Sequence, residues 1–265
     1  MRTLCNEAEI DAAVAIKAGA SRAFGTAGTT PFASDLTAAA NLLKIFKDNG
    51  APTGDGGLTL AIDSNAGLKL RSLANLVQAY QAGTDATLRQ GVLLDMFGLK
   101  IKESAGIATH TKGTGTSYVT SGSTAKGVTD IALVTGSGTV LAGDVVTFAA
   151  DSNNKYVVNT GVAAPGTISL GRPGARVTIA TSNAMTIGND YAANVAFHKM
   201  AVVGAVRPPE IPANPIIRSI QMTDMESGLP FTLLEIAQYG QITWELHLAW
   251  GFAVVNPEHV AVLLG

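Results

Sequence analysis

The feature that most constrains the fold is a run of alternating residues between Ile242 and Val254. Every second side chain is large and apolar, and the residues between are small or polar. The apolar positions are Ile242, Trp244, Leu246, Leu248, Trp250, Phe252 and Val254. Because successive side chains of a strand point to opposite faces, the pattern indicates a strand with one buried face. It predicts one long strand that closes the fold, with both tryptophans in the core, where truncation to alanine would cost about 3–5 kcal/mol.

The composition is that of a folded protein with little charge. Of the 265 residues, 47% are hydrophobic and 14% are charged, against about 25% charged in average globular domains. Either the chain is an ordinary Ala- and Gly-rich domain, or neighbouring subunits cover much of its surface. The net charge of −2 argues against a dedicated nucleic-acid binder, so any nucleic-acid contact is expected to be weak and non-specific.

The sequence also argues against a disulfide-bonded, a secreted and a membrane-spanning protein. Cys5 is the single cysteine, so no intrachain disulfide or thiolate-rich metal site forms, which fits synthesis in a reducing compartment. Acidic residues interrupt the place where the apolar part of a signal peptide would lie. No apolar run reaches the length of about 18 residues that a membrane-spanning helix needs.

Local patterns predict an α+β fold. Helical spacing with Ile10 and Val14 on the apolar face covers residues 6–23, and Asp63 begins a turn suited to a helix cap. Ser34 is a plausible cap for another helix. The expected elements are helices over residues 6–23, 35–47 and 66–81 and strands over 58–62, 99–103 and 192–206. Prolines between residues 208 and 215 then make a stiff connector to a hairpin that turns near residues 226–228.

Residues 109–188 differ in character from the rest. They are rich in Gly, Thr, Ser and Val, and turn sequences such as Ser152-Asn153-Asn154 separate short β-prone pieces. These pieces are residues 130–134, 145–149, 156–159, 167–170 and 176–181. The pattern predicts a small, independently packed all-β barrel or sandwich inserted into the α+β part. The chain therefore divides into residues 1–33, 34–108, 109–188 and 189–265.

Motifs of catalysis and ligand binding are missing. The pairs Gly113-x-Gly115 and Gly136-x-Gly138 lack the third glycine of a dinucleotide fingerprint. The histidines His110, His198, His247 and His259 are not at metal-ligand spacing, and His198 and His247 are expected in the core or in an interface. We therefore predict no catalytic, cofactor-binding or metal residues and no enzyme.

Several stretches resemble the major capsid proteins of tailed bacteriophages. They are Arg2-Thr3-Leu4 before a helix and residues 21–32, 60–67, 86–91, 141–149 and 249–259. The resemblance covers essentially the whole chain and is strongest to the coat-protein group of the Salmonella temperate podovirus, which carries an inserted β-domain. Its motifs are structural rather than catalytic.

This resemblance implies a Hong Kong 97-like fold. Residues 6–23 would be the spine helix, about 35–85 and 190–240 the axial domain, and 99–103 with the closing strand the peripheral sheet. The N-terminal arm and extended loop that precede the spine helix in that family are expected to be absent here.

The function that the resemblance implies is that of a structural major capsid protein. It would self-assemble as hexamers and pentamers into the icosahedral shell around phage double-stranded DNA, with scaffolding and portal proteins as partners. It would be made in the bacterial host cytoplasm and reside in the virion capsid.

Two alternatives stay open at this point. Residues 109–188 could carry a ligand- or carbohydrate-binding module with the α+β part as scaffold. A hydrolase whose site converges from distant segments could use Asp63, Asp144, Asp224 and the histidines.

Overall fold

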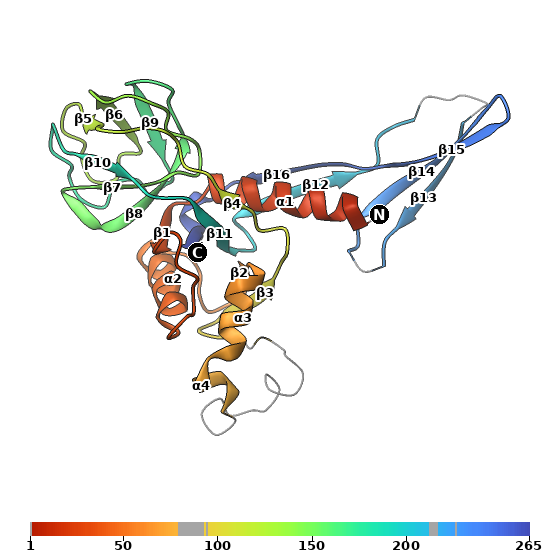
Figure 1. Ribbon diagram of the computed structural model, residues 1–265, viewed down its shortest axis with the longest axis horizontal. Coiled ribbons are helices and arrows are strands. Elements are labelled where there is room, and N and C mark those ends of the chain that lie inside the picture. Colours follow the sequence, from red (N-terminus) through yellow and green to blue (C-terminus); the bar gives the residue numbers. More distant parts are fainter. Residues whose placement is uncertain (1, 79–92, 94, 212–216, 226) are drawn as a thin grey trace.

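The structure is a computed structural model that describes residues 2–78, 93, 95–211, 217–225 and 227–265. The molecule is elongated, with a β-rich part at one end, a sheet covered by helices in the middle and a narrow β-arm at the other end (Figure 1). The fold is therefore mixed α+β with more strand than helix.

The middle of the molecule is built on one large sheet that continues into the β-rich part. Its strands follow the order β3-β2-β11-β17-β1-β8-β9-β6-β5. In the middle these are β1 Arg22–Gly25, β2 Leu58–Ile62, β3 Leu99–Glu103, β11 Tyr191–His198 and β17 Val260–Leu264, with β4 Thr109–His110 beside β11. The strand β17 is parallel to β1 and antiparallel to β11. The C-terminal strand is thus central to the sheet.

The burial of β17 explains how the middle is organised. All five of its residues are buried, as expected for a strand covered on both faces. Ala261 and Leu263 belong to one hydrophobic cluster, with residues of β2 and of the helices α2 Thr37–Asp48 and α3 Ser64–Ser72. Val260, Val262 and Leu264 belong to another, with Ile16 of the helix α1 Arg2–Ala18 and residues of β11. Side-chain alternation along one strand therefore joins two cores.

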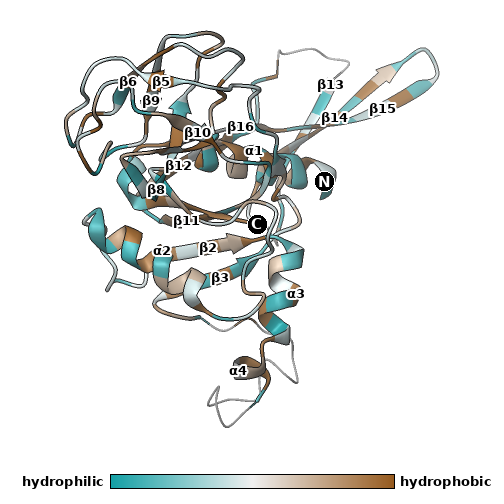
Figure 2. Cartoon of the chain, turned by 60° about the vertical axis from the view of Figure 1, so that its left-hand side comes forward, coloured by the Kyte–Doolittle hydropathy of each residue, from teal (hydrophilic) through white to brown (hydrophobic). Residues whose placement is uncertain are grey.

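The helices lie on the two sides of this sheet (Figures 1 and 2). They are α1 Arg2–Ala18, α2 Thr37–Asp48, α3 Ser64–Ser72 and α4 Ala74–Val77, with a 3-10 turn at Pro257–His259. Asp63 caps α3 by accepting hydrogen bonds from the amides of Asn65 and Ala66. This confirms the cap expected from the sequence.

The β-rich part has its own hydrophobic cluster, drawn entirely from residues between Tyr118 and Met185. Its strands are β5 Val119–Thr120, β6 Asp130–Val134, β7 Val145–Phe148, β8 Asp151–Thr160, β9 Thr167–Leu170 and β10 Met185–Ile187. The strand β8 also pairs with β1, with Arg22 opposite Tyr156 and Ala23 opposite Lys155. Backbone hydrogen bonds therefore connect this part to the middle of the molecule.

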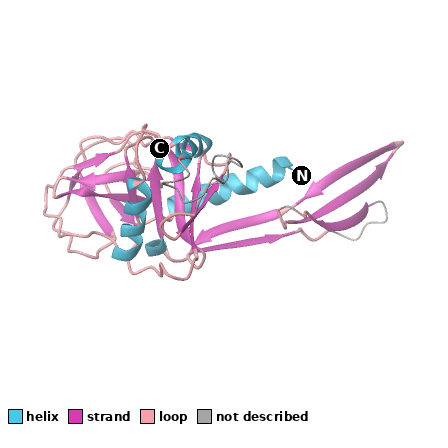
Figure 3. Cartoon of the chain, turned by 90° about the horizontal axis from the view of Figure 1, so that it is seen from below, coloured by secondary structure: helices cyan, strands magenta, loops and turns pink. Residues whose placement is uncertain are grey.

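The arm consists of two narrow sheets in line (Figure 3). The first is a ribbon of β12 Val202–Arg207 and β16 Ala249–Val254, and the second joins β13 Ile217–Thr223, β14 Pro230–Gln238 and β15 Gln241–His247. The helix α1 packs on the ribbon. At this contact the indole nitrogen of Trp250 donates to Asp11 Oδ2 at 2.9 Å, so the helix and the ribbon are fixed to each other.

The prediction of one long closing strand was wrong. The run is two strands separated at Leu248, because β15 pairs with β14 in the outer sheet whereas β16 pairs with β12 in the ribbon. Trp250 is half-buried, but Trp244 is 56% exposed and Ile242 is 60% exposed. Both lie in a sheet that projects from the body, so Trp244 is not in the core.

Other boundaries also need correction. The first helix ends at Ala18, and Arg22–Gly25 is a strand, because pairing with β17 overrides the helical propensity there. Ile10 and Val14 are exposed, and α1 buries Ala8 and Ile16 instead.

Four further expectations differ from the structure. The residue before α2 is Leu36, without a side-chain cap, so Ser34 is not its cap. The strand β3 pairs with β2 and not with the closing strand. Residues 152–154 continue β8 instead of turning, and residues 176–181 contribute one isolated bridge instead of a strand.

Some expectations cannot be compared. The helix predicted over 66–81 is interrupted after Ser72 and continues as α4, and residues 79–81 lie outside the described residues. The stretch at 86–91 and residues 212–215 of the proline connector also lie outside them.

Candidate functional site

The four histidines do not form a common site. His110 and His198 are buried, and His247 lies in the arm, where Nε2 is 3.0 Å from Glu245 Oε2. The ring of His259 meets that of His198 edge to face, with centroids 6.1 Å apart. His198 Nε2 is 3.0 Å from Asp55 Oδ2. Within the described part of the chain, no group of three or more His, Cys, Asp or Glu residues is arranged to hold a metal ion.

A buried chain of polar groups joins three elements. Lys17 Nζ of α1 lies 3.0 Å from Nδ1 of His110, and His110 Nε2 lies 2.8 Å from Oδ1 of Asp144. A lysine ammonium can only donate, so Nδ1 of His110 accepts and Nε2–H donates to Asp144. Burial lowers the pKa of Lys17, and the Asp144 carboxylate acts in the opposite direction.

The carboxylate of Asp144 accepts hydrogen bonds from groups of three different residues. It accepts from the amides of Gly113 and Leu141 as well as from His110, and it is wholly buried. The other two acids of the hydrolase alternative also have local roles, since Asp63 caps α3 and Asp224 accepts from Ser227 in the turn before β14. The three acids thus lie in three different parts of the molecule, and the described contacts favour structural roles for them.

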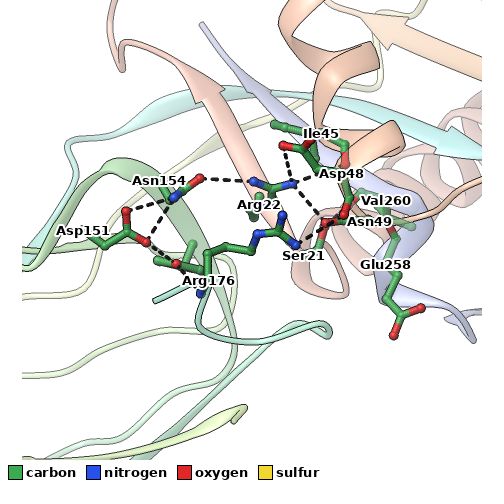
Figure 4. A network of polar contacts seen from close by, with 11 residues as sticks. Ser21, Arg22, Ile45, Asp48, Asn49, Asp151, Asn154, Arg176, Glu258 and Val260 are labelled. Carbon is green, nitrogen blue, oxygen red and sulfur yellow. Dashed lines mark hydrogen bonds and ion pairs between the residues drawn. The ribbon is translucent and has the colours of Figure 1, made fainter. Parts of the chain in front are cut away.

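A second polar network surrounds Arg22 of β1 (Figure 4). Its side chain is 5% exposed. The guanidinium donates to Asn154 Oδ1 of β8 at 3.1 Å and to Asn49 Oδ1, just after α2, at 3.0 Å. Asp48 Oδ2 lies 3.6 Å away. Burial is the main cause that lowers the pKa of Arg22, and the charge of Arg176 adds to it.

One face of the outer sheet of the arm is mostly apolar, although Arg218 and Glu235 also lie on it. In an antiparallel sheet, directly opposite residues share a face. Ile220 of β13 is opposite Leu233 of β14, which is opposite Leu246 of β15, and Glu235 is opposite Trp244. We call the face that carries these residues the arm face. Its apolar members are Ile220, Met222, Phe231, Leu233, Ala237, Ile242, Trp244 and Leu246.

The arm face is covered only near its base. Phe231, at the inner end of β14, is fully buried, whereas Ile220, Ile242 and Trp244 are 55%, 60% and 56% exposed. The opposite face carries polar residues such as Gln221, Thr243 and Glu245 together with Ile236 and Leu234, and Leu234 is buried. Hydrophobic and hydrophilic residues accordingly alternate along the arm (Figure 2). A contiguous apolar patch rimmed by polar residues is typical of an interaction surface.

A shallow apolar pocket of about 290 Å³ lies in the β-rich part. Its walls carry no aromatic and no charged side chain. The one hydroxyl, that of Thr139, already lies 3.2 Å from the hydroxyl of Thr114. Ligand sites combine apolar walls with a few free polar groups, so this pocket offers little for recognition of a sugar.

The comparisons with known proteins add little to this picture. No protein-family model and no curated protein matches the chain. Solved structures do match, and one of them is a chain titled "Mycobacterium phage Che8". The TM-score is 0.47 and the sequence identity 16%, over 99% of this chain and 59% of that one. The chain thus spans about three-fifths of the length of that structure. No helix among the described residues is long and apolar enough to cross a membrane.

Proposed function

We propose that this chain is a subunit of a self-assembling shell, the major capsid protein of a tailed bacteriophage with a Hong Kong 97-like fold. In this assignment α1 is the spine helix, and the sheet with α2 and α3 is the axial part. The arm is assigned to the peripheral part, in place of the axial domain that the resemblance implied for residues 202–240. The β-rich part is the insertion typical of the podovirus coat-protein group that the sequence resembles. The protein then resides in the virion capsid, after synthesis in the host cytoplasm.

The observation that carries this proposal is the uncovered arm face. Ile242 and Trp244 lie outside the body on a thin sheet, with more than half of each side chain exposed. Apolar burial is worth about 25 cal/mol per Å², so an exposed face of this kind gains free energy when a second copy covers it. The low charge content of 14% is in line with a surface covered by neighbours.

The geometry of the arm suits contacts between copies. The arm extends along the long axis of the molecule (Figures 1 and 3), and α1 and the indole of Trp250 brace its base. A braced, projecting sheet can reach a neighbouring subunit without distorting its own body. Hexamers and pentamers of the shell follow if each arm packs on the next subunit in a closed ring.

The observations favour a shell subunit over the two alternatives. A carbohydrate-binding module would need aromatic side chains or free polar groups, whereas the pocket of the β-rich part has no aromatic side chain and its Thr139 hydroxyl already lies 3.2 Å from that of Thr114. A hydrolase would need its acids near one another and near a base, whereas Asp63 and Asp224 have separate local roles. Contacts with packaged DNA, scaffolding and portal proteins belong to the same proposal.

Electron microscopy of the purified chain tests this function. We expect closed shells, capsomers or other large regular particles, whose appearance depends on protein concentration. A chain that stays monomeric and monodisperse at high concentration by light scattering would contradict the proposal.

A further inference from the structure

A second surface feature lies where the β-rich part meets the middle of the molecule. A pocket of about 100 Å³ opens between β1, α2 and β8. Arg22, Lys44 and Lys155 contribute to its walls, and Asp48 is the one carboxylate among its lining residues. Asn153 and Asn154 of β8 add amide groups. Three segments distant in sequence thus bring three cations to one place.

The charges in this pocket are poorly balanced by the protein itself. Asp48 Oδ2 is 3.6 Å from Arg22, which is longer than a hydrogen bond, and the Asp48 side chain is 35% exposed. Lys44 makes no hydrogen bond or ion pair to any residue that the structure describes. Lys155 Nζ donates to the backbone oxygen of Gly25 and has further donors to offer. An anion would therefore meet two cations that lack a carboxylate partner.

Arg22 also carries an N–H group without a hydrogen-bond acceptor. Its Nε is buried and has no hydrogen-bond partner in the described part of the chain. Arg176 lies near enough for its charge to lower the pKa of Arg22. Buried polar groups without partners are rare in folded proteins and call for an explanation. A bound anion that offsets the positive charge around Arg22 would supply one.

The size of the pocket limits the ligand. One water occupies about 30 Å³ in the liquid, so the volume of about 100 Å³ matches a group of a few heavy atoms, such as a tetrahedral oxyanion. Arginine and lysine are the residues that bind phosphate oxygens most often, through charge-assisted hydrogen bonds. The pocket has no room for a nucleoside.

We propose that this pocket binds a phosphate-type oxyanion, with Arg22 at its buried wall and Lys44 and Lys155 as donors nearer the surface. The anion is either free inorganic phosphate or a phosphate of a nucleic-acid backbone. Because Lys44 belongs to α2 and Lys155 to β8, a bound anion also links the β-rich part to the middle of the molecule. This site is independent of the arm and of the proposed shell.

Calorimetric titration of the full chain with inorganic phosphate at low ionic strength tests the site. We expect saturable binding, a rise in melting temperature with phosphate, and at least about tenfold weaker binding in Lys44→Met and Lys155→Met. The matched control is Lys47→Met, an exposed lysine of the same helix that does not line the pocket, which should bind as the wild type does. No binding at millimolar phosphate, or an equal loss in the control, overturns the proposal.

A variant that is expected to bind phosphate more tightly serves as a further control, because misfolding cannot explain an increase in affinity. Asp48→Asn removes the one lining carboxylate and should strengthen phosphate binding about threefold or more. Unchanged or weaker binding in this variant, with an unaltered circular dichroism spectrum, counts against the site.

A short DNA duplex distinguishes the two sources of phosphate. Displacement of phosphate by the duplex, with weaker duplex binding in Lys44→Met than in Lys47→Met, supports a backbone phosphate as the ligand. Phosphate binding that the duplex does not disturb supports a free anion. Duplex binding that both variants reduce equally, without phosphate binding, shows diffuse attraction and overturns the proposal.

Discussion

Substitution of Gly19 by alanine should loosen the contact between α1 and the arm. A Cβ at this position would lie 2.5 Å from both Cβ and Cγ2 of Val254 in β16, whereas ordinary contacts are 3.4–4 Å. Valine is stiff about its first side-chain torsion, so the side chain of Val254 cannot rotate away from the added methyl group. The helix end and the ribbon must therefore separate by about 1 Å.

The expected cost combines two opposing effects. Overpacking of this kind costs about 1–3 kcal/mol. Replacing glycine by alanine at a residue without positive φ lowers the entropy of the unfolded chain and returns about 0.4–1 kcal/mol. The net loss for Gly19→Ala should then be about 0.5–2 kcal/mol. The double variant Gly19→Ala, Val254→Ala should recover part of it, with a coupling of about 1 kcal/mol.

Urea denaturation followed by circular dichroism measures these differences. Gly54→Ala is the matched control, because no atom lies within 4 Å of the position that its Cβ would occupy and its φ is not positive. It should be neutral or slightly stabilising. If Gly19→Ala unfolds at the same urea concentration as this control, the packing of α1 against the arm is not as close as described.

Three further predictions concern the interior. Asp144→Ala should lower the free energy of unfolding by about 3–5 kcal/mol, because it leaves His110 and the amides of Gly113 and Leu141 without their acceptor. The exposed Asp130→Ala should change the free energy of unfolding by less than about 1 kcal/mol in the same urea titration. Phe231→Ala, at a fully buried position, should lower the free energy of unfolding measured by calorimetry by about 3–5 kcal/mol. Trp244→Ala, at an exposed position, should lower the free energy of unfolding of the monomer by less than about 1 kcal/mol. Burial, with the hydrogen bond to Asp151, raises the pKa of Tyr156 above its ordinary value of 10.0. The contribution of the Tyr156 hydroxyl to stability is therefore complete below pH 10.0, and it is lost progressively as the pH rises above this value, because the unfolded chain then loses the phenol proton more readily than the folded one. The difference in melting temperature between wild type and Tyr156→Phe should therefore shrink from about pH 9 to about pH 11, and a constant difference would contradict the raised pKa.

Elements set by local sequence were predictable. The strand at Leu58–Ile62 and the cap at Asp63 follow from a short apolar run next to a turn residue. The strands Asp130–Val134 and Thr167–Leu170 lie between turns that their own residues specify. In each case the local residues carry the signal, although the strand Leu58–Ile62 is held by pairing with the distant strands β3 and β11.

Elements set by distant partners were not predictable. Large apolar residues occupy every second position both before and after Leu248. The pattern therefore gives no sign that the chain leaves the outer sheet of the arm at this residue and enters the ribbon of β12 and β16. The pattern also says which side chains share a face but not whether anything covers that face. Periodicity alone therefore places Trp244 in a core, whereas its position on the outer part of the arm leaves it 56% exposed.

The polar clusters were missed for the same reason. Lys17 and His110 are 93 residues apart, and Arg22 and Asn154 are 132 residues apart. A single lysine or arginine in an apolar stretch carries no sign of which partner the fold will bring to it. Only the pairing of β1 with β8 places Arg22 beside Asn154.

The central claim is that copies of the chain associate through the arm face, and sedimentation velocity of two neighbouring variants tests it most directly. Trp244→Lys puts a charge on the arm face, and Thr243→Lys puts the same charge on the opposite face of the same strand. We expect wild type and Thr243→Lys to form large assemblies and Trp244→Lys to sediment as a monomer with an unchanged circular dichroism spectrum. Equal assembly of both variants, or a wild type that stays monomeric, would contradict the account.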